Sequence, residues 1–185
     1  MDFKQIKIEI IKKLLVFLQQ LQKELFGEKG FWDFAEALGE RESGGDYKIV
    51  NTLGYLGKWQ FGLARLADFG YCERIPGTTG FGNDKFRWKA PYSKEGFLNS
   101  PTFQQEVFKL HVKNLVKAFE SNPYLGLYVA GVKITLSGCV AMSHLAGVSG
   151  TKRFLTTGGE FSDAYGTSIA EYGKLFADYN LSEVG

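Results

Sequence analysis

The chain has 185 residues, a length that fits one globular domain and leaves little room for a second. Its 22 Lys and Arg residues nearly balance its 20 Asp and Glu residues, so the formal charge of +2 excludes a field strong enough to attract nucleic acid by itself. Only Cys72 and Cys139 are present, which allows one disulfide at most and excludes a disulfide-stapled framework.

Residues 3–26 are predicted to form an amphipathic helix, because apolar residues recur there at steps of three and four. Such a face usually packs on the protein's own domain, which is the interpretation we favour. A membrane surface, a partner or an upstream domain are the alternatives. Lysines and glutamates interrupt the apolar run, so we expect neither a signal peptide nor a transmembrane segment. We therefore divide the chain into an N-terminal helix at 1–30 and a single globular domain at 31–185.

A second helix is predicted from residue 31 to about 42, and Ser43-Gly44-Gly45 ends it. Glu40 and Glu42 lie about 200° apart around this helix, so only one of them can face a cleft while the other is solvated. A carboxyl group beneath aromatic side chains loses solvation of its charged form and holds a proton near neutrality, as a general acid must. An isolated glutamate is nevertheless most often a surface residue.

The segment that follows, from residue 46 to 59, loses the helical period and is predicted to form a short, twisted hairpin. Its glycines allow the backbone to approach a bulky ligand. Asn51 and Gln60 supply amide donors and acceptors, and Tyr55 and Trp59 supply rings. Rings that stack on pyranose faces, together with amides that bind hydroxyl groups, are typical of sugar sites.

The rest of the chain reads as further helices and one long connection. Residues 60–69 are predicted to be helical, and 70–100 to be an irregular excursion of the length that usually serves function. Ser100 and Pro101 mark the start of a helix to about 120, on which we expect His111 to be exposed. A short helix is predicted to begin at 122, and a further helix to cover 167–179. Between them, helices are predicted at 134–146 and 148–156, separated by a break at Gly147. The fold class is therefore α+β, predominantly α-helical, with a small β element after Glu42.

Several short motifs then carry a resemblance. Glu42-Ser43-Gly44, followed by the GYLGKWQFG stretch at 54–62, resembles the E-S-G and G-x-x-G-x-x-Q motifs of lysozyme-like lytic transglycosylases and goose-type lysozymes. The AMSHLAGVSG stretch at 141–150 is similar to that family's A-Y-N-A-G-x-G segment. Gly166-Thr167-Ser168 with Tyr172 is similar to its E-T-x-x-Y motif. Order and spacing agree over residues 32–179, although His144-Leu145 replaces Tyr-Asn and the last motif lacks its Glu.

The resemblance implies a lysozyme-like fold with a β-hairpin after the catalytic helix, and cleavage of the β-1,4 bond between N-acetylmuramic acid and N-acetylglucosamine. Glu42 would be the catalytic acid and base. Asp46 is the first choice for a second carboxylate and Asp84 the next, which leaves hydrolysis and anhydro-ring formation open. The expected substrate-binding residues are Asn51, Tyr55, Trp59, Gln60, His144 and Tyr172, although a lone histidine such as His144 is more often structural.

The expected partner is the peptidoglycan glycan strand, with no nucleic acid, cofactor or metal. The two histidines and two cysteines do not lie at zinc-ligand spacing. Action on the cell wall, in the periplasm or outside the cell, would then need delivery by a phage or secretion apparatus. Two alternatives remain: a non-catalytic glycan-binding or structural module of a cell-wall assembly, and an interaction protein that docks through the helix at 3–26.

Overall fold

The computed structural model describes residues 3–27, 29–159 and 166–184. Most of these residues are helical and two small antiparallel sheets complete the fold, which confirms the predicted α+β, predominantly helical class. The α-helices are α1 (Phe3–Phe26), α2 (Phe31–Ser43), α3 (Leu63–Asp68), α4 (Lys94–Leu98), α5 (Pro101–Phe119), α6 (Leu136–Thr157) and α7 (Ile169–Leu175). The strands and 3₁₀ turns are β1 (Cys72–Arg74), η1 (Asn83–Lys85), β2 (Phe86–Trp88), β3 (Tyr128–Val129), β4 (Val132–Lys133) and η2 (Ser182–Val184).

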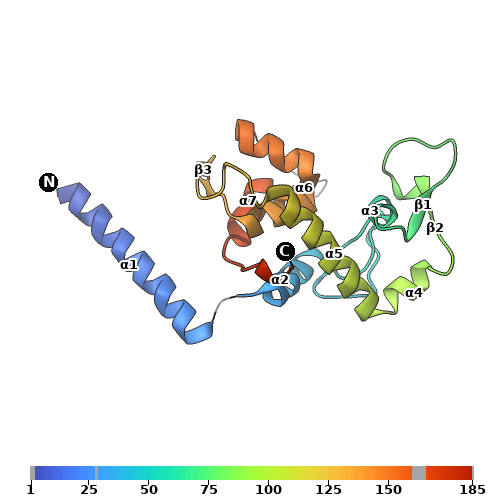
Figure 1. Ribbon diagram of the computed structural model, residues 1–185, viewed down its shortest axis with the longest axis horizontal. Coiled ribbons are helices and arrows are strands. Elements are labelled where there is room, and N and C mark those ends of the chain that lie inside the picture. The colour runs from blue at the N-terminus through green and yellow to red at the C-terminus, as the bar shows by residue number, and fades with distance from the viewer. Residues whose placement is uncertain (1–2, 28, 160–165, 185) are drawn as a thin grey trace.

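Helix α5 is the centre of the globular part. Ser100 caps it as predicted, since its hydroxyl accepts a hydrogen bond from the Phe103 N–H. Figure 1 shows α5 crossing the middle of the molecule, with α6 and α7 toward one end and α3, β1 and β2 toward the other. Phe108 on its buried face stacks on Trp59 with ring centroids 4.3 Å apart. The main core therefore joins α2, the segment after it and α5.

Helix α6 packs against both α5 and α7 and contains the predicted break. Gly147 has φ 72° and ψ 167°, a conformation outside the helical region that glycine adopts without steric cost. The Thr135 hydroxyl accepts a hydrogen bond from the Gly138 N–H and caps the start of the helix. The first half of α6 thus begins at a capped residue and is buried in the core.

The β structure differs from the prediction. Residues 46–59 hold isolated bridges at Leu56, which pairs with Val50 and with Phe61, rather than two full strands. The Asn51 side chain explains this, because its Oδ1 accepts hydrogen bonds from the N–H groups of Leu53 and Tyr55 and closes a turn instead of a ladder. The complete hairpin, β1–β2, lies in the segment predicted to be irregular. The predicted helix at 122 is also wrong: a turn leads there into the β3–β4 hairpin.

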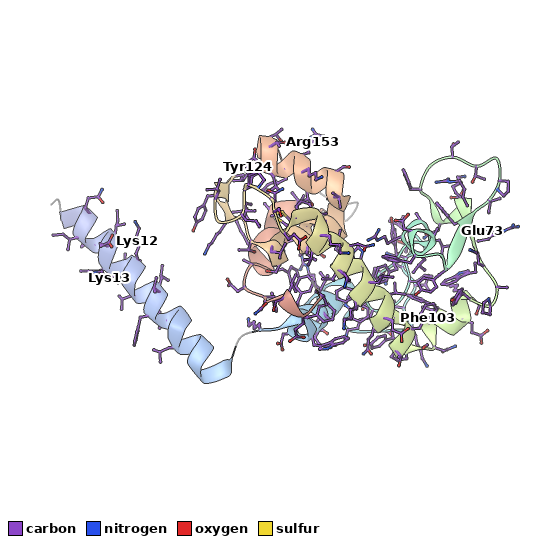
Figure 2. All side chains as sticks on the ribbon, viewed as in Figure 1. Lys12, Lys13, Glu73, Phe103, Tyr124 and Arg153 are labelled. Carbon is purple, nitrogen blue, oxygen red and sulfur yellow. The ribbon has the colours of Figure 1, made fainter. Side chains whose placement is uncertain are left out.

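Helix α1 forms as predicted, but its side chains described between residues 5 and 18 do not pack on the domain as expected. Figure 1 shows it projecting from the globular part, and Figure 2 shows Lys12 and Lys13 on it, away from the side chains that crowd around α5. Its described side chains from 5 to 18 are exposed, and Phe17 retains 60% of its surface. Among the residues that the structure describes, no helix has both the length and the hydropathy to cross a bilayer.

Candidate active site

Glu42 lies in the last turn of α2, where the chain leaves the helix sharply. Gly44 adopts the left-handed conformation with φ 64°, and its N–H bonds back to the Glu40 carbonyl. The Ser43 hydroxyl donates to the carbonyls of Gly39 and Lys58, which ties the helix end to the following segment. The Glu42 side chain keeps only 16% of its surface exposed, whereas Glu40 is exposed. The prediction that one of the two glutamates is solvated is therefore confirmed.

Tyr172 of α7 holds the Glu42 carboxyl group. Its hydroxyl donates a hydrogen bond of 2.6 Å to Glu42 Oε1, a short distance that is typical of a charged acceptor. Burial, followed by the charge of Glu42, raises the pKa of Tyr172, so the hydroxyl keeps its proton and acts as the donor. An exposed ion pair of 2.8 Å between Arg41 and Glu171 joins the same two helices beside this contact.

Two buried histidines continue from the carboxyl group into the protein. His144 Nε2 on α6 lies 3.8 Å from Glu42 Oε1, and His144 Nδ1 lies 3.1 Å from Nε2 of His111 on α5. The other ring nitrogen of His111, Nδ1, accepts a 2.9 Å hydrogen bond from Nε of Arg65 on α3. Arg65 in turn contacts Asp68 at 3.0 Å. Four helices thus contribute to one continuous polar chain.

Both histidines favour the neutral form. Burial lowers the pKa of His111 well below its ordinary value, and the neighbouring His144 and Arg65 lower it further. Burial also lowers the pKa of His144; Arg65 adds to this, while the Glu42 charge and a hydrogen bond with the Trp59 backbone act in the opposite direction. The site therefore places two uncharged imidazoles beside a carboxyl group.

A cavity of about 210 Å³ opens on this polar chain. Its lining residues are Tyr55, Gln60, Phe61, Gly62, Ala64, Arg65, Phe81, His111 and His144. They combine rings, an amide, a guanidinium and imidazoles. A larger hollow of about 400 Å³ lies at Lys48, Lys94, Glu95, Leu98 and Asn99, none of which contacts Glu42. The smaller cavity is the better candidate site, because its wall includes the histidine nearest to the carboxyl group.

The structure brings four of the predicted residues to Glu42 or to the cavity. Tyr172 contacts the carboxyl group directly, but it is 3% exposed and does not line the cavity, so the prediction that it binds substrate is wrong and its contact is with Glu42 instead. His144 lies beside the carboxyl group and lines the cavity. Tyr55 and Gln60 line the cavity as well. Gln60 has a positive φ of 48° and donates a hydrogen bond to the Gly57 carbonyl, so a local turn fixes its direction.

Trp59 requires a correction. Its side chain has 0% exposure, and its indole N–H donates to the Ala35 carbonyl at 2.8 Å. A ring sealed in the core in this way has no face to offer a sugar, so the predicted substrate contact is wrong. Trp59 is instead a core residue that stacks on Phe108 of α5.

The other predicted polar residues serve local turns. Asp46 is exposed, and its Oδ1 accepts a hydrogen bond from the Lys48 N–H, as expected of an aspartate that closes a turn. Asn51 also closes a turn, because its Oδ1 accepts a hydrogen bond from the Leu53 N–H. Asp84 forms an ion pair with Lys85, and this hydrogen bond lowers the Asp84 pKa. Neither aspartate lines the cavity.

His111, Arg65 and Phe81 line the cavity, and sequence reasoning missed all three. The expectation that His111 is exposed is wrong, since it retains 6% of its surface. Its spacing carried a signal: His111 lies three residues after Phe108 and four before Leu115, within the apolar face of its helix. Nothing comparable marks Arg65.

Both cysteines are buried and free, and burial raises the pKa of each thiol to about 12. Within the described residues, no group of three His, Cys, Asp or Glu side chains is arranged to hold a metal ion. Comparison of the chain with protein-family models, with curated proteins and with solved structures gives no significant match.

Proposed function

We propose that this chain cleaves the β-1,4 bond between N-acetylmuramic acid and N-acetylglucosamine in peptidoglycan, with Glu42 as the general acid and base. The observation that carries the proposal is the Glu42 carboxyl group, which is mostly buried, held by Tyr172 and adjacent to a histidine in a cavity wall. Glu42 itself does not line the cavity; His144 beside it does. A positioned carboxyl group is the group that acid catalysis of glycoside cleavage requires.

The two oxygens of Glu42 have different surroundings, and the proposed mechanism uses that difference. Oε1 accepts from Tyr172 and faces His144. We therefore assign the transferable proton to Oε2, which would pass it to the glycosidic oxygen as the bond to the sugar carbon breaks. The resulting carboxylate then accepts a proton from the attacking nucleophile, with Tyr172 stabilising the negative charge on Oε1.

The cavity wall supports a sugar substrate. Tyr55 and Phe81 are 40% and 82% exposed, so both rings have free faces for the apolar side of a pyranose. Gln60 provides amide groups for hydroxyl or acetamido substituents. Arg65 adds a permanent positive charge in the same wall, which suits the carboxylate of a muramic acid residue.

Two nucleophiles are compatible with a single carboxyl group. Water would give a reducing end, and the C6 hydroxyl of the muramic acid would close an anhydro ring. Because Asp46 is bonded to the Lys48 N–H and Asp84 is paired with Lys85, neither is assigned a role in activating water. The two products differ by one water molecule and are separated by mass.

Purified sacculi provide the test. Wild type should lower the turbidity of a sacculus suspension and release muropeptides, whereas Glu42→Gln should release none above background, because an amide cannot donate and recover the proton. Mass spectrometry of the released fragments then separates anhydro from reducing ends. Unchanged lysis by Glu42→Gln removes this residue from the mechanism.

A non-catalytic glycan-binding module is the second candidate, and one observation favours it. Glu42 is not among the cavity-lining residues and its Oε1 is already occupied by the Tyr172 hydroxyl, as expected of a carboxyl group that stabilises the wall of a binding site. Binding of wild type to sacculi in a pull-down, with no product in the mass spectrum, would support this module over the enzyme.

A further inference from the structure

We propose that Arg65 sets the tautomers of His111 and His144 through a directed chain of hydrogen bonds, so that His144 presents an uncharged N–H group toward Glu42. The tautomer chain follows from the geometry alone. Its role as a positioning device for the acid rests on the proposed function.

The direction of the chain begins at Arg65. A guanidinium group carries N–H donors, has no acceptor and keeps its charge at all ordinary pH values. The 2.9 Å contact between Arg65 Nε and His111 Nδ1 therefore has one possible polarity: arginine donates and the imidazole nitrogen accepts. A neutral imidazole has one hydrogen on its two nitrogens. With Nδ1 occupied as the acceptor, the hydrogen of His111 is on Nε2.

The same argument carries to the second ring. His111 Nε2 lies 3.1 Å from His144 Nδ1. Since Nε2 of His111 carries the hydrogen, Nδ1 of His144 accepts it, and the single hydrogen of neutral His144 must be on Nε2. That nitrogen is the one 3.8 Å from Glu42 Oε1. The assignment comes from donor and acceptor logic rather than from observed hydrogens.

Protonation of either ring would break the chain. An imidazolium has hydrogens on both nitrogens, so a charged His144 would point Nδ1–H at the Nε2–H of His111, and a charged His111 would point Nδ1–H at Arg65. The groups that face the pair are Glu42 on α2, the Trp59 backbone, and Arg65 on α3. Glu42 is the one acidic side chain among them. The lowered pKa values of both histidines agree with the neutral chain.

Neutrality matters for the acid. A protonated His144 would place a positive charge 3.8 Å from Glu42 Oε1, whereas the neutral ring places only an N–H dipole there. At 3.8 Å the His144 N–H is beyond hydrogen-bond distance, so it faces Oε1 as a dipole while the Tyr172 hydroxyl holds that oxygen. Arg65 is therefore a positioning residue, because it determines through two rings that a hydrogen rather than a lone pair of His144 faces Glu42.

Nitrogen-15 NMR on histidine-labelled protein tests the chain directly. In wild type at neutral pH, both rings should show a pyrrole-type Nε2 and a pyridine-type Nδ1. Arg65→Met removes the donor and the charge; it should give His111 a mixture of tautomers and raise the pKa of both histidines in an NMR titration. Arg153→Met is the matched control, since Arg153 is an exposed arginine on the same helix as His144, and should leave both rings unchanged.

Failure of this inference and failure of the proposed function give different results. A pyrrole-type Nδ1 or a tautomer mixture in wild type overturns the chain, even if the protein digests sacculi. The predicted wild-type spectrum without any digestion leaves the chain standing and removes the enzyme. If Arg65→Met does not fold, the wild-type spectrum alone still decides.

Discussion

Replacing Tyr172 with Phe removes one hydroxyl group and leaves the ring, so it isolates the contact that holds Glu42. The lost interaction is a 2.6 Å hydrogen bond to a carboxylate; a hydrogen bond to a charged group contributes about 1.5–3 kcal/mol. Part of this is offset, because Phe needs no desolvation of a hydroxyl and Glu42 retains 16% exposure to water. We expect a net loss of about 1–2 kcal/mol in the free energy of unfolding.

Urea unfolding at neutral pH measures this loss, and thermal unfolding should show a decrease of about 2–4 °C in Tm for each kcal/mol. Tyr128→Phe is the control, since Tyr128 is 71% exposed and such a change is expected within about 0.5 kcal/mol of wild type. Combining Tyr172→Phe with Glu42→Ala should then give a coupling free energy of at least about 0.5 kcal/mol.

Two results would refute the reasoning about Tyr172. One is a Tyr172→Phe variant as stable as the Tyr128→Phe control. The other is a double variant whose loss equals the sum of the two single losses within about 0.3 kcal/mol, because independent sites are additive to that precision. Either result would mean that the hydroxyl and the carboxyl group do not stabilise one another.

Three further predictions concern the surroundings of the site. Acidification should destabilise the fold, because burial holds the pKa of both histidines below 6.5 and the unfolded chain therefore binds protons first. Between about pH 7.5 and 5.5 the free energy of unfolding measured in urea should fall by up to about 1.4 kcal/mol per pH unit for each histidine. Equal stability at both pH values contradicts this. Gly57→Ala places a Cβ 2.0 Å from the buried Gln104 side chain at a residue with φ 70°, and should lower the free energy of unfolding by about 2–4 kcal/mol. Gly77→Ala, where φ is 80° and the surrounding space is open, measures the backbone strain alone. Equal losses for the two variants would exclude the clash. Deleting residues 1–27 should leave the unfolding free energy within about 0.5 kcal/mol of wild type and reduce any self-association in sedimentation, and a large loss of stability would show that α1 packs on the domain.

The end of α2 could be predicted from the sequence because its determinants are local. An apolar stripe, a Ser-Gly-Gly ending and the separation of Glu40 from Glu42 around the helix follow from residue spacing alone. The contact between Tyr172 and Glu42 cannot be predicted from residue spacing, since the two residues are 130 positions apart. The resemblance of short motifs indicates Tyr172 as a site residue but not its bond to the carboxyl group.

The errors arise where local patterns leave a choice that tertiary packing decides. Trp59 follows the glycines of a cleft-like motif, yet nothing in that motif tells whether the ring turns outward or stacks on Phe108. An amide at position 51 suits a sugar equally well, but the Asn51 oxygen closes a turn within its own segment. Exposure of His111 is the wrong prediction because this residue lies on the apolar face of α5.

The glycine-rich segment at 54–62 is hydrogen-bonded to both α2 and α5. Gly57 passes directly over Gln104, whose side chain accepts from the Lys58 N–H and donates to the carbonyls of Tyr47 and Phe97. A side chain at position 57 would push this buried amide away. The Trp59 indole bonds to α2, as does the Lys58 carbonyl through Ser43. With both sides fixed in this way, Tyr55 and Gln60 have little freedom except to face the cavity, so buried hydrogen bonds rather than the exposed rings determine the shape of the candidate site.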